Sequence, residues 1–156
     1  MQHAKLVKSY LLHWNIFMPI SLTQEMKEKI ANALNENYPV LISTVDQDGQ
    51  PWQSFYGSTH VFDESSLAFW IRDPQARMIK RIEANSPISF LYRNSKEKII
   101  WQFHGNAEIV SDEDLTNVIY EGIHPGEQAK DPDRDGYAVH VKINLVLQGS
   151  KILMES

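Results

Sequence analysis

Apolar and polar residues alternate along several segments of the chain, most clearly between residues 137 and 147. Every second position there is apolar, a period typical of a strand with one buried face. Aromatic and β-branched residues dominate five further runs bounded by turn-forming residues, at 40–45, 51–61, 67–71, 88–92 and 99–110. The pattern therefore predicts six strands. The strand at 67–71 has consecutive apolar residues and should be buried on both faces.

A helix is predicted between Ser21 and Asn35, because apolar residues recur there at every fourth position. Ser21 and Gln24 fit a capping box at its start. Pro39 follows the helix and prevents its continuation. The apolar stripe of this helix consists of Leu22, Met26, Ile30 and Leu34.

Two shorter helices are expected later in the chain. Asp73 should cap the first of them, with Pro74 in its first helical position. Ser111 and Asp114 form a second capping pattern, which opens a helix that continues through Ile119.

Glycines and prolines mark the connections between these elements. Gly49 closes a turn at 46–49 and can take a positive φ, and Gly105 is expected at a bulge or bend. The segment 123–135 contains two prolines and four acidic residues and has no strand or helix pattern. A loop of this length indicates a function or an interface. Its acidic residues could bind a cation, remain in solvent, or close over the groove of a second subunit.

Strands joined mostly by tight turns, with helices between them, favour a mainly β fold. We expect a six-stranded antiparallel barrel, closed or nearly closed, with flanking α-helices. The length of 156 residues fits one domain, which we assign to 21–156. Residues 1–20 are interpreted as an N-terminal extension or helical arm, and Met18 is a candidate for the natural start.

Composition narrows the possible functions. The chain contains no cysteine, which excludes disulfides and zinc–thiolate sites and fits a cytoplasmic location. A net charge of −5 argues against general nucleic-acid binding. No segment approaches the ~20 consecutive apolar residues of a membrane span. No histidine pair has the spacing of helical metal ligands, so we expect neither a membrane anchor nor a metal site.

Basic residues cluster around the expected start of the second helix: Arg72, Arg77, Lys80 and Arg81. Backbone N–H groups at a helix start and nearby arginines supply the fixed donors and positive charge that a phosphate group needs. Alternatively, the four cations form the solvated face of a short helix, and Asp73 competes with phosphate for the same donors. Periodicity alone leaves both interpretations open.

The segment from Gly49 to Tyr92 resembles the central part of the pyridoxamine 5'-phosphate oxidase-like flavin-binding split barrels. Arg77 falls on the arginine of the family's Ser-Arg-Lys element, with Met78 at the lysine. The order of elements is similar from Ser21 to Val110. The matching motifs are Gly49-Gln50-Pro51-Trp52-Gln53, Phe69-Trp70-Ile71 and Ile82-Glu83-Ala84-Asn85.

This resemblance implies a homodimer that binds FMN in a groove between its subunits. It also implies an oxidoreductase acting on a small, unidentified substrate, in which the flavin carries out the redox chemistry. Arg72 and Arg77, with Lys80, would hold the phosphate. The cofactor-binding residues implied are Ser54, Phe55, Tyr56, Trp70, Ile71, Arg72, Arg77 and Lys80. No catalytic acid or base is implied.

Three positions depart from the true oxidases, so the chain resembles a small relative of them. Ser54 stands where the oxidases have arginine, Thr59 where they have lysine, and Ile100 where they have a glutamine. These departures motivate an alternative, a non-catalytic carrier or sensor of haem, a B6 vitamer or a deazaflavin on the same barrel. The candidate haem ligands are His60, His104 and His140. A third hypothesis is a structural dimer module that binds no ligand.

Overall fold

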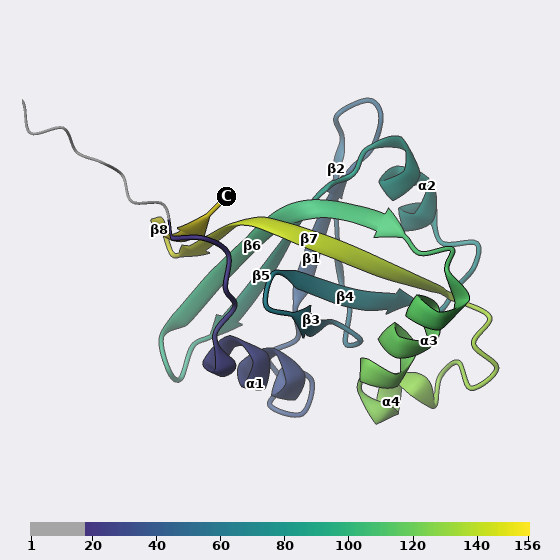
Figure 1. Cartoon of the computed structure of the whole chain (residues 1–156), viewed down its shortest axis with the longest axis horizontal. Coiled ribbons are helices and arrows are strands. Elements are labelled where there is room, and N and C mark those ends of the chain that lie inside the picture. The colour runs from purple at the N-terminus through teal and green to yellow at the C-terminus, as the bar shows by residue number, and fades with distance from the viewer. Residues whose placement is uncertain (1–17) are drawn as a thin grey trace, which may run out of the picture.

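The computed structural model describes residues 18–156, so most of the expected N-terminal arm lies outside the described residues. Figure 1 shows a curved sheet with helices packed at its ends. In chain order the elements are α1 (Gln24–Asn32), β1 (Leu41–Val45), β2 (Pro51–Phe55), β3 (His60–Asp63), β4 (Ser66–Ile71), α2 (Arg77–Ala84), β5 (Pro87–Asn94), β6 (Ile99–Ile109), α3 (Glu113–Gly122), α4 (Pro125–Gln128), β7 (Tyr137–Gln148) and β8 (Lys151–Glu155).

The sheet is antiparallel in every strand pairing among residues 18–156. Its order is β2-β1-β5-β6-β7-β4-β3, and β8 pairs with β7. The first half of β7, residues 137–142, pairs with β4, whereas residues 145–148 pair with β8. The prediction of a mainly β fold with flanking helices is therefore confirmed. The sheet has eight strands, two more than the sequence pattern predicted.

The two additional strands have separate causes. The run expected as one strand at 51–61 is divided into β2 and β3 by a turn, in which the amide and the hydroxyl of Thr59 both donate to the Tyr56 carbonyl, at 3.2 and 2.8 Å. The Ser58 hydroxyl then bonds both the amide and the carbonyl of Trp70, at 3.0 Å each. The second addition, β8, follows a turn at Gly149, whose φ is 58°.

Two helices are capped one or two residues after the residue that the sequence predicted as their cap. Thr23 caps α1, because its hydroxyl accepts a hydrogen bond from the Met26 amide at 3.2 Å. The expected cap, Ser21, instead donates its amide to the Met154 sulfur at 3.5 Å. Asp112 rather than Ser111 caps α3. In each case a residue one or two positions further along has a side chain that suits the same role.

Strand β4 separates two apolar clusters. All six of its residues are buried, as its consecutive apolar residues predicted. Phe69 belongs to the main core of the sheet, whereas Trp70 belongs to a smaller cluster covered by α3. The smaller cluster comprises Ala68, Trp70, Val110, Ile119, Tyr120, Ile123 and Ala138.

The two glycines singled out by the sequence have the expected roles. Gly49 has a φ of 83° at its turn. Gly105 lies at a register shift between β6 and β7, where an added Cβ would be 2.9 Å from the carbonyl carbon of Lys142. The close approach of the two strands therefore requires a glycine at position 105. Among the described residues, no helix has the length and apolar character needed to cross a membrane.

Candidate functional site

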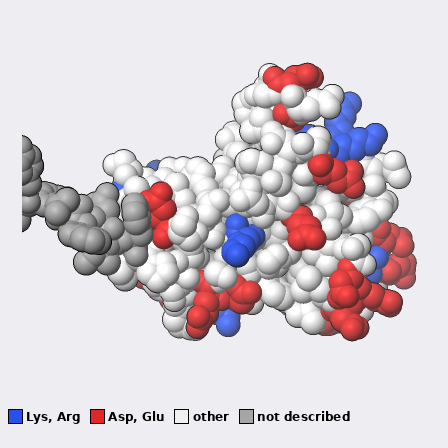
Figure 2. Space-filling view, turned by 45° about the horizontal axis from the view of Figure 1, so that its top comes forward, with Lys and Arg blue, Asp and Glu red and all other residues white. Residues whose placement is uncertain are grey.

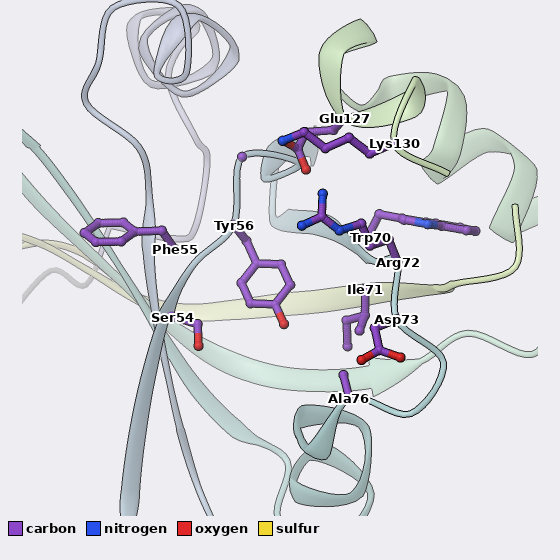
Figure 3. A pocket seen from close by; sticks show the side chains of 11 residues that line it. Ser54, Phe55, Tyr56, Trp70, Ile71, Arg72, Asp73, Ala76, Glu127 and Lys130 are labelled. Atoms are coloured by element: carbon purple, nitrogen blue, oxygen red, sulfur yellow. The ribbon is translucent and has the colours of Figure 1, made fainter. Parts of the chain in front are cut away.

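A pocket of about 370 Å³ lies where the ends of β2 and β4 meet the start of α2 and the end of α4 (Figure 3). Strand β2 and the turn after it form one wall, and β4 with α4 forms the other. Of the eight residues implied by the resemblance, the structure brings six to this pocket: Ser54, Phe55, Tyr56, Trp70, Ile71 and Arg72. Arg77 and Lys80 lie on α2 and are exposed outside this lining.

Tyr56 extends its ring into the pocket between Ser54 and Ile71 (Figure 3). The ring packs edge-on against Phe69, with the ring centroids 5.2 Å apart. Burial raises the pKa of the Tyr56 phenol, and the positive charges of Arg81 and Arg72 only partly oppose that effect. The hydroxyl is therefore neutral near pH 7 and can donate a hydrogen bond to a ligand.

The two other aromatic residues expected here turn their rings elsewhere. The Phe55 side chain is 66% exposed and points to the opposite side of β2 from Tyr56 (Figure 3). The Trp70 side chain is 3% exposed and packs edge-on against Tyr120, with the ring centroids 5.1 Å apart. In the described chain, Trp70 therefore contributes to the pocket wall while its ring lies in the smaller apolar cluster.

The start of α2 differs from the sequence prediction in a way that affects the site. The helix begins at Arg77, and Asp73 is not its cap. The Asp73 carboxylate instead accepts a hydrogen bond from the Gln75 amide at 2.9 Å, because residues 73–76 form a turn before the helix. Ala76 occupies the cap position, has no side chain that can accept a hydrogen bond, and lines the pocket. The N–H groups of Arg77 and Met78 at the start of α2 have no side-chain cap and lie beside the pocket, whereas the Ile79 amide donates to the Ala76 carbonyl at 3.1 Å.

The basic residues around α2 divide into two groups. Arg72 points its guanidinium toward the space between Tyr56 and Glu127 (Figure 3). Arg81 is bound within the chain, since its Nε donates to the Thr44 hydroxyl at 2.8 Å and its guanidinium lies 5.1 Å from the Trp52 ring centre. Basic side chains gather over α2 in Figure 2, and acidic side chains gather over α3 and α4.

Sequence reasoning missed two charged residues of the pocket, Glu127 and Lys130. They form an ion pair of 2.6 Å at the end of α4, and the Glu127 side chain is only 16% exposed. Gly57 lies opposite, where an added Cβ would be 3.1 Å from a Glu127 carboxylate oxygen. The segment 123–135 was expected to be functional because of its length, but length alone could not place these two side chains.

The candidate haem ligands lie outside this pocket. His60 has its Nδ1 3.1 Å from the Ser58 carbonyl, and burial lowers the pKa of its imidazole. His104 lies beside Gln102, and His140 packs edge-on against Phe62. Within residues 18–156, no three His, Asp or Glu side chains are grouped to hold a metal ion.

The family model described as pyridoxamine 5'-phosphate oxidase matches residues 26–145, which include both walls of the pocket. The chain belongs to this family. The match confirms the resemblance seen in the sequence and extends it to β7. No match was found among curated proteins.

Solved structures share the fold of this family member. HupZ from Group A Streptococcus is 20% identical with a TM-score of 0.66, and the match covers 86% of this chain and 98% of HupZ. An FMN-binding protein from Syntrophomonas wolfei is 13% identical with a TM-score of 0.62, covering 81% and 87% of the two chains. An F420 reductase is 16% identical with a TM-score of 0.54, covering 70% and 89%.

Proposed function

We propose that the chain binds FMN in this pocket and acts as a flavin-dependent oxidoreductase on a small substrate. The observation that carries the proposal is the uncapped start of α2, which lies beside a pocket lined by Tyr56 and Arg72. A helix start with free N–H groups favours a phosphate, and arginines add charged hydrogen bonds. This donor set fits the phosphate of FMN, and FMN would supply the redox chemistry when bound.

Each part of the pocket has a role in this proposal. The N–H groups of α2, with Arg72 and Arg77 and with Lys80 one turn further on, would hold the phosphate. Tyr56 and Ile71 would lie against the ring system, and the buried strand β4 would keep that side of it free of water. Ser54 could donate a hydrogen bond to the ring from the end of β2.

We propose further that the chain is a homodimer with the cofactor at the subunit interface. Strand β2 lies at one edge of the sheet, next to the pocket. It carries Phe55, 66% exposed, and Trp52, 40% exposed. Exposed aromatics on an edge strand are typical of a surface that a partner covers. Sedimentation of the purified chain at twice the monomer mass would support this arrangement, and a monomer that binds FMN would contradict it.

The first test is the visible absorption spectrum of the purified protein, repeated after addition of excess FMN and desalting. Retained flavin close to one per chain would support the proposal. Arg77→Ala should then weaken FMN binding by about 1.5–3 kcal/mol if the side chain bonds the phosphate. Arg93→Ala, at an exposed position on β5, is the matched control. Equal affinity of both variants in a fluorescence titration would remove Arg77 from the site.

One observation favours the alternative of a non-catalytic carrier or sensor. Among the lining residues, Arg72 and Lys130 are balanced by Asp73 and Glu127. Thr59, where the true oxidases have lysine, is buried and bonds the Tyr56 carbonyl. This wall therefore attracts an anion less than that of the oxidases. A bound flavin that nicotinamide cofactors cannot reduce would favour a carrier, a Soret band would indicate haem, and retained F420 would indicate a deazaflavin.

A further inference from the structure

We propose that Asp131 is a positioning residue, which holds α4 against the pocket so that Glu127 and Lys130 become part of the ligand site. The identity of the ligand rests on the proposed function. The contacts of Asp131 do not depend on it.

Asp131 has a different environment from the other acids of its segment. The residue is 7% exposed, whereas Asp133 and Asp135 are exposed. Its carboxylate accepts three hydrogen bonds, from the Trp70 indole at 2.8 Å, the Asp135 amide at 3.0 Å and the Gly136 amide at 2.9 Å. A buried carboxylate is tolerated only when such donors replace the lost water. The indole bond ties the segment after α4 to strand β4, and the two amide bonds hold the segment 131–136 together.

Tyr120 also fixes the end of α4 beside Trp70. Its hydroxyl lies 2.9 Å from the Asp131 carbonyl and 3.0 Å from the Gln128 carbonyl, while the Gln128 side chain donates to the Tyr120 carbonyl at 3.0 Å. The Tyr120 ring packs against Trp70 on one side and lies 4.2 Å from the Arg134 guanidinium. Both ends of the stretch 128–131 are thus fixed to the apolar cluster beneath α3.

Gly136 brings this segment onto the pocket wall itself. An added Cβ would lie 2.6 Å from the Trp70 indole nitrogen and 2.7 Å from the Arg72 Cα. Trp70 and Arg72 both line the pocket. Asp131 is therefore held by the same part of the chain, around Trp70 and Arg72, that forms the pocket wall.

The position of Lys130 gives this arrangement a functional consequence. Lys130 directly precedes Asp131 and is paired with Glu127 across the end of α4. With α4 held in place, Lys130 and Arg72 both lie at the pocket, where they can act together on an anionic group of the ligand. Glu127 adds a carboxylate beside Gly57 that can accept an N–H group of the ligand. Loss of the Asp131 hydrogen bonds would therefore move Glu127 and Lys130 away from the pocket together.

The experiment compares Asp131→Asn with Asp133→Asn, which makes the same change of charge at an exposed position of the same segment. Hydrogen exchange of the segment 123–136 in the ligand-free protein should accelerate about tenfold in Asp131→Asn, the loss expected for one charged hydrogen bond. The same segment should exchange at the wild-type rate in Asp133→Asn. Equal rates in the two variants would overturn the proposal.

FMN titrations then test the link to the ligand. Asp131→Asn should weaken FMN binding about tenfold in the wild-type background and much less in a Glu127→Ala/Lys130→Ala background, because its effect acts through those side chains. An equal loss in both backgrounds would overturn the positioning role. A wild-type chain without affinity for FMN would overturn the proposed function alone, since the exchange comparison needs no ligand. Should Asp131→Asn fail to fold, Trp70→Phe removes the indole donor and serves the same comparison.

Discussion

The two strands that form the walls of the pocket, β4 and β2, each carry a tryptophan whose indole donates to an aspartate, but the two pairs lie in opposite environments. On the β4 side, Trp70 and Asp131 are 3% and 7% exposed and are 2.8 Å apart. On the β2 side, Trp52 is 40% exposed and bonds Asp46 at 3.1 Å. The first pair holds three segments of the chain together, whereas the second covers one turn and the Arg81 guanidinium.

The comparison shows that burial is the largest influence on the pKa of Asp131, whereas a hydrogen bond is the largest influence on the pKa of Asp46. The indole of Trp52 is the main cause that lowers the pKa of Asp46. For Asp131, burial raises the pKa, and the bonds from Trp70, Asp135 and Gly136 more than compensate and lower it overall. The β4 wall is thus complete within one chain. The β2 wall keeps two exposed aromatic side chains, Trp52 and Phe55.

The largest difference between the walls should come from removing each tryptophan. Trp70→Ala leaves a cavity and removes one of the three donors to the buried Asp131 carboxylate, so we expect a loss of about 3–5 kcal/mol in the free energy of unfolding. Trp52→Ala should cost no more than about 1 kcal/mol, because its contacts are exposed. Urea unfolding of both variants measures this difference. Similar losses would show that the β2 wall is also closed, by a subunit partner.

A smaller difference is expected between two glycines. Gly136→Ala forces a methyl group onto the Trp70 indole and the Arg72 backbone, which should cost roughly 3 kcal/mol. Gly49→Ala, in the turn that leads to β2, meets open space and strains only its φ of 83°, at about 1 kcal/mol. Thermal unfolding compares the two. A larger loss of stability from Gly49→Ala than from Gly136→Ala would contradict this expectation, because the β2 side would then tolerate change less well than the β4 side.

The smallest expected effect is on the pH dependence of stability, and it arises from His60 on β3, the strand beside β4. Burial lowers the pKa of His60 in the folded chain below its ordinary value of 6.5. The unfolded chain therefore binds more protons as the pH falls through 6.5, so stability decreases from there until the pH reaches the lowered folded value. His60→Gln should reduce this slope in denaturant titrations between pH 7 and pH 5. An unchanged slope would assign the pH dependence to another group.

Much of the fold could be predicted from the sequence because its strands have strong local patterns. The period of two at 137–147 and the apolar run at 67–71 correspond to β7 and β4. The turn inside 51–61 was missed, because Gly57, Ser58 and Thr59 interrupt an aromatic run without a proline. Their turn depends on the bond from Ser58 to Trp70 twelve residues away, which no local pattern contains.

The parts of the site that are contiguous in sequence could be predicted, whereas the residues that tertiary folding brings to it could not. Residues 54–56 and 70–72 are six of the eight residues that the resemblance implied, and they line one pocket. Asp131 lies in an acidic segment, which local reasoning interprets as solvated, and only the tertiary approach of Trp70 distinguishes it from Asp133. A possible signal was Gly136, a glycine directly before the most regular strand.

Strand β7 also has a consequence for how the chain reaches its native state. It is the shared neighbour of β4, β6 and β8, yet it is synthesised after both β4 and β6. Until residues 137–148 leave the ribosome, the backbone edge of β4 that pairs with β7 has no partner. Unpaired strand edges of this kind are prone to aggregation. Nascent chains that stop before β7 should therefore depend on chaperones, and closure of the sheet should be a late, slow step dominated by contacts between distant residues.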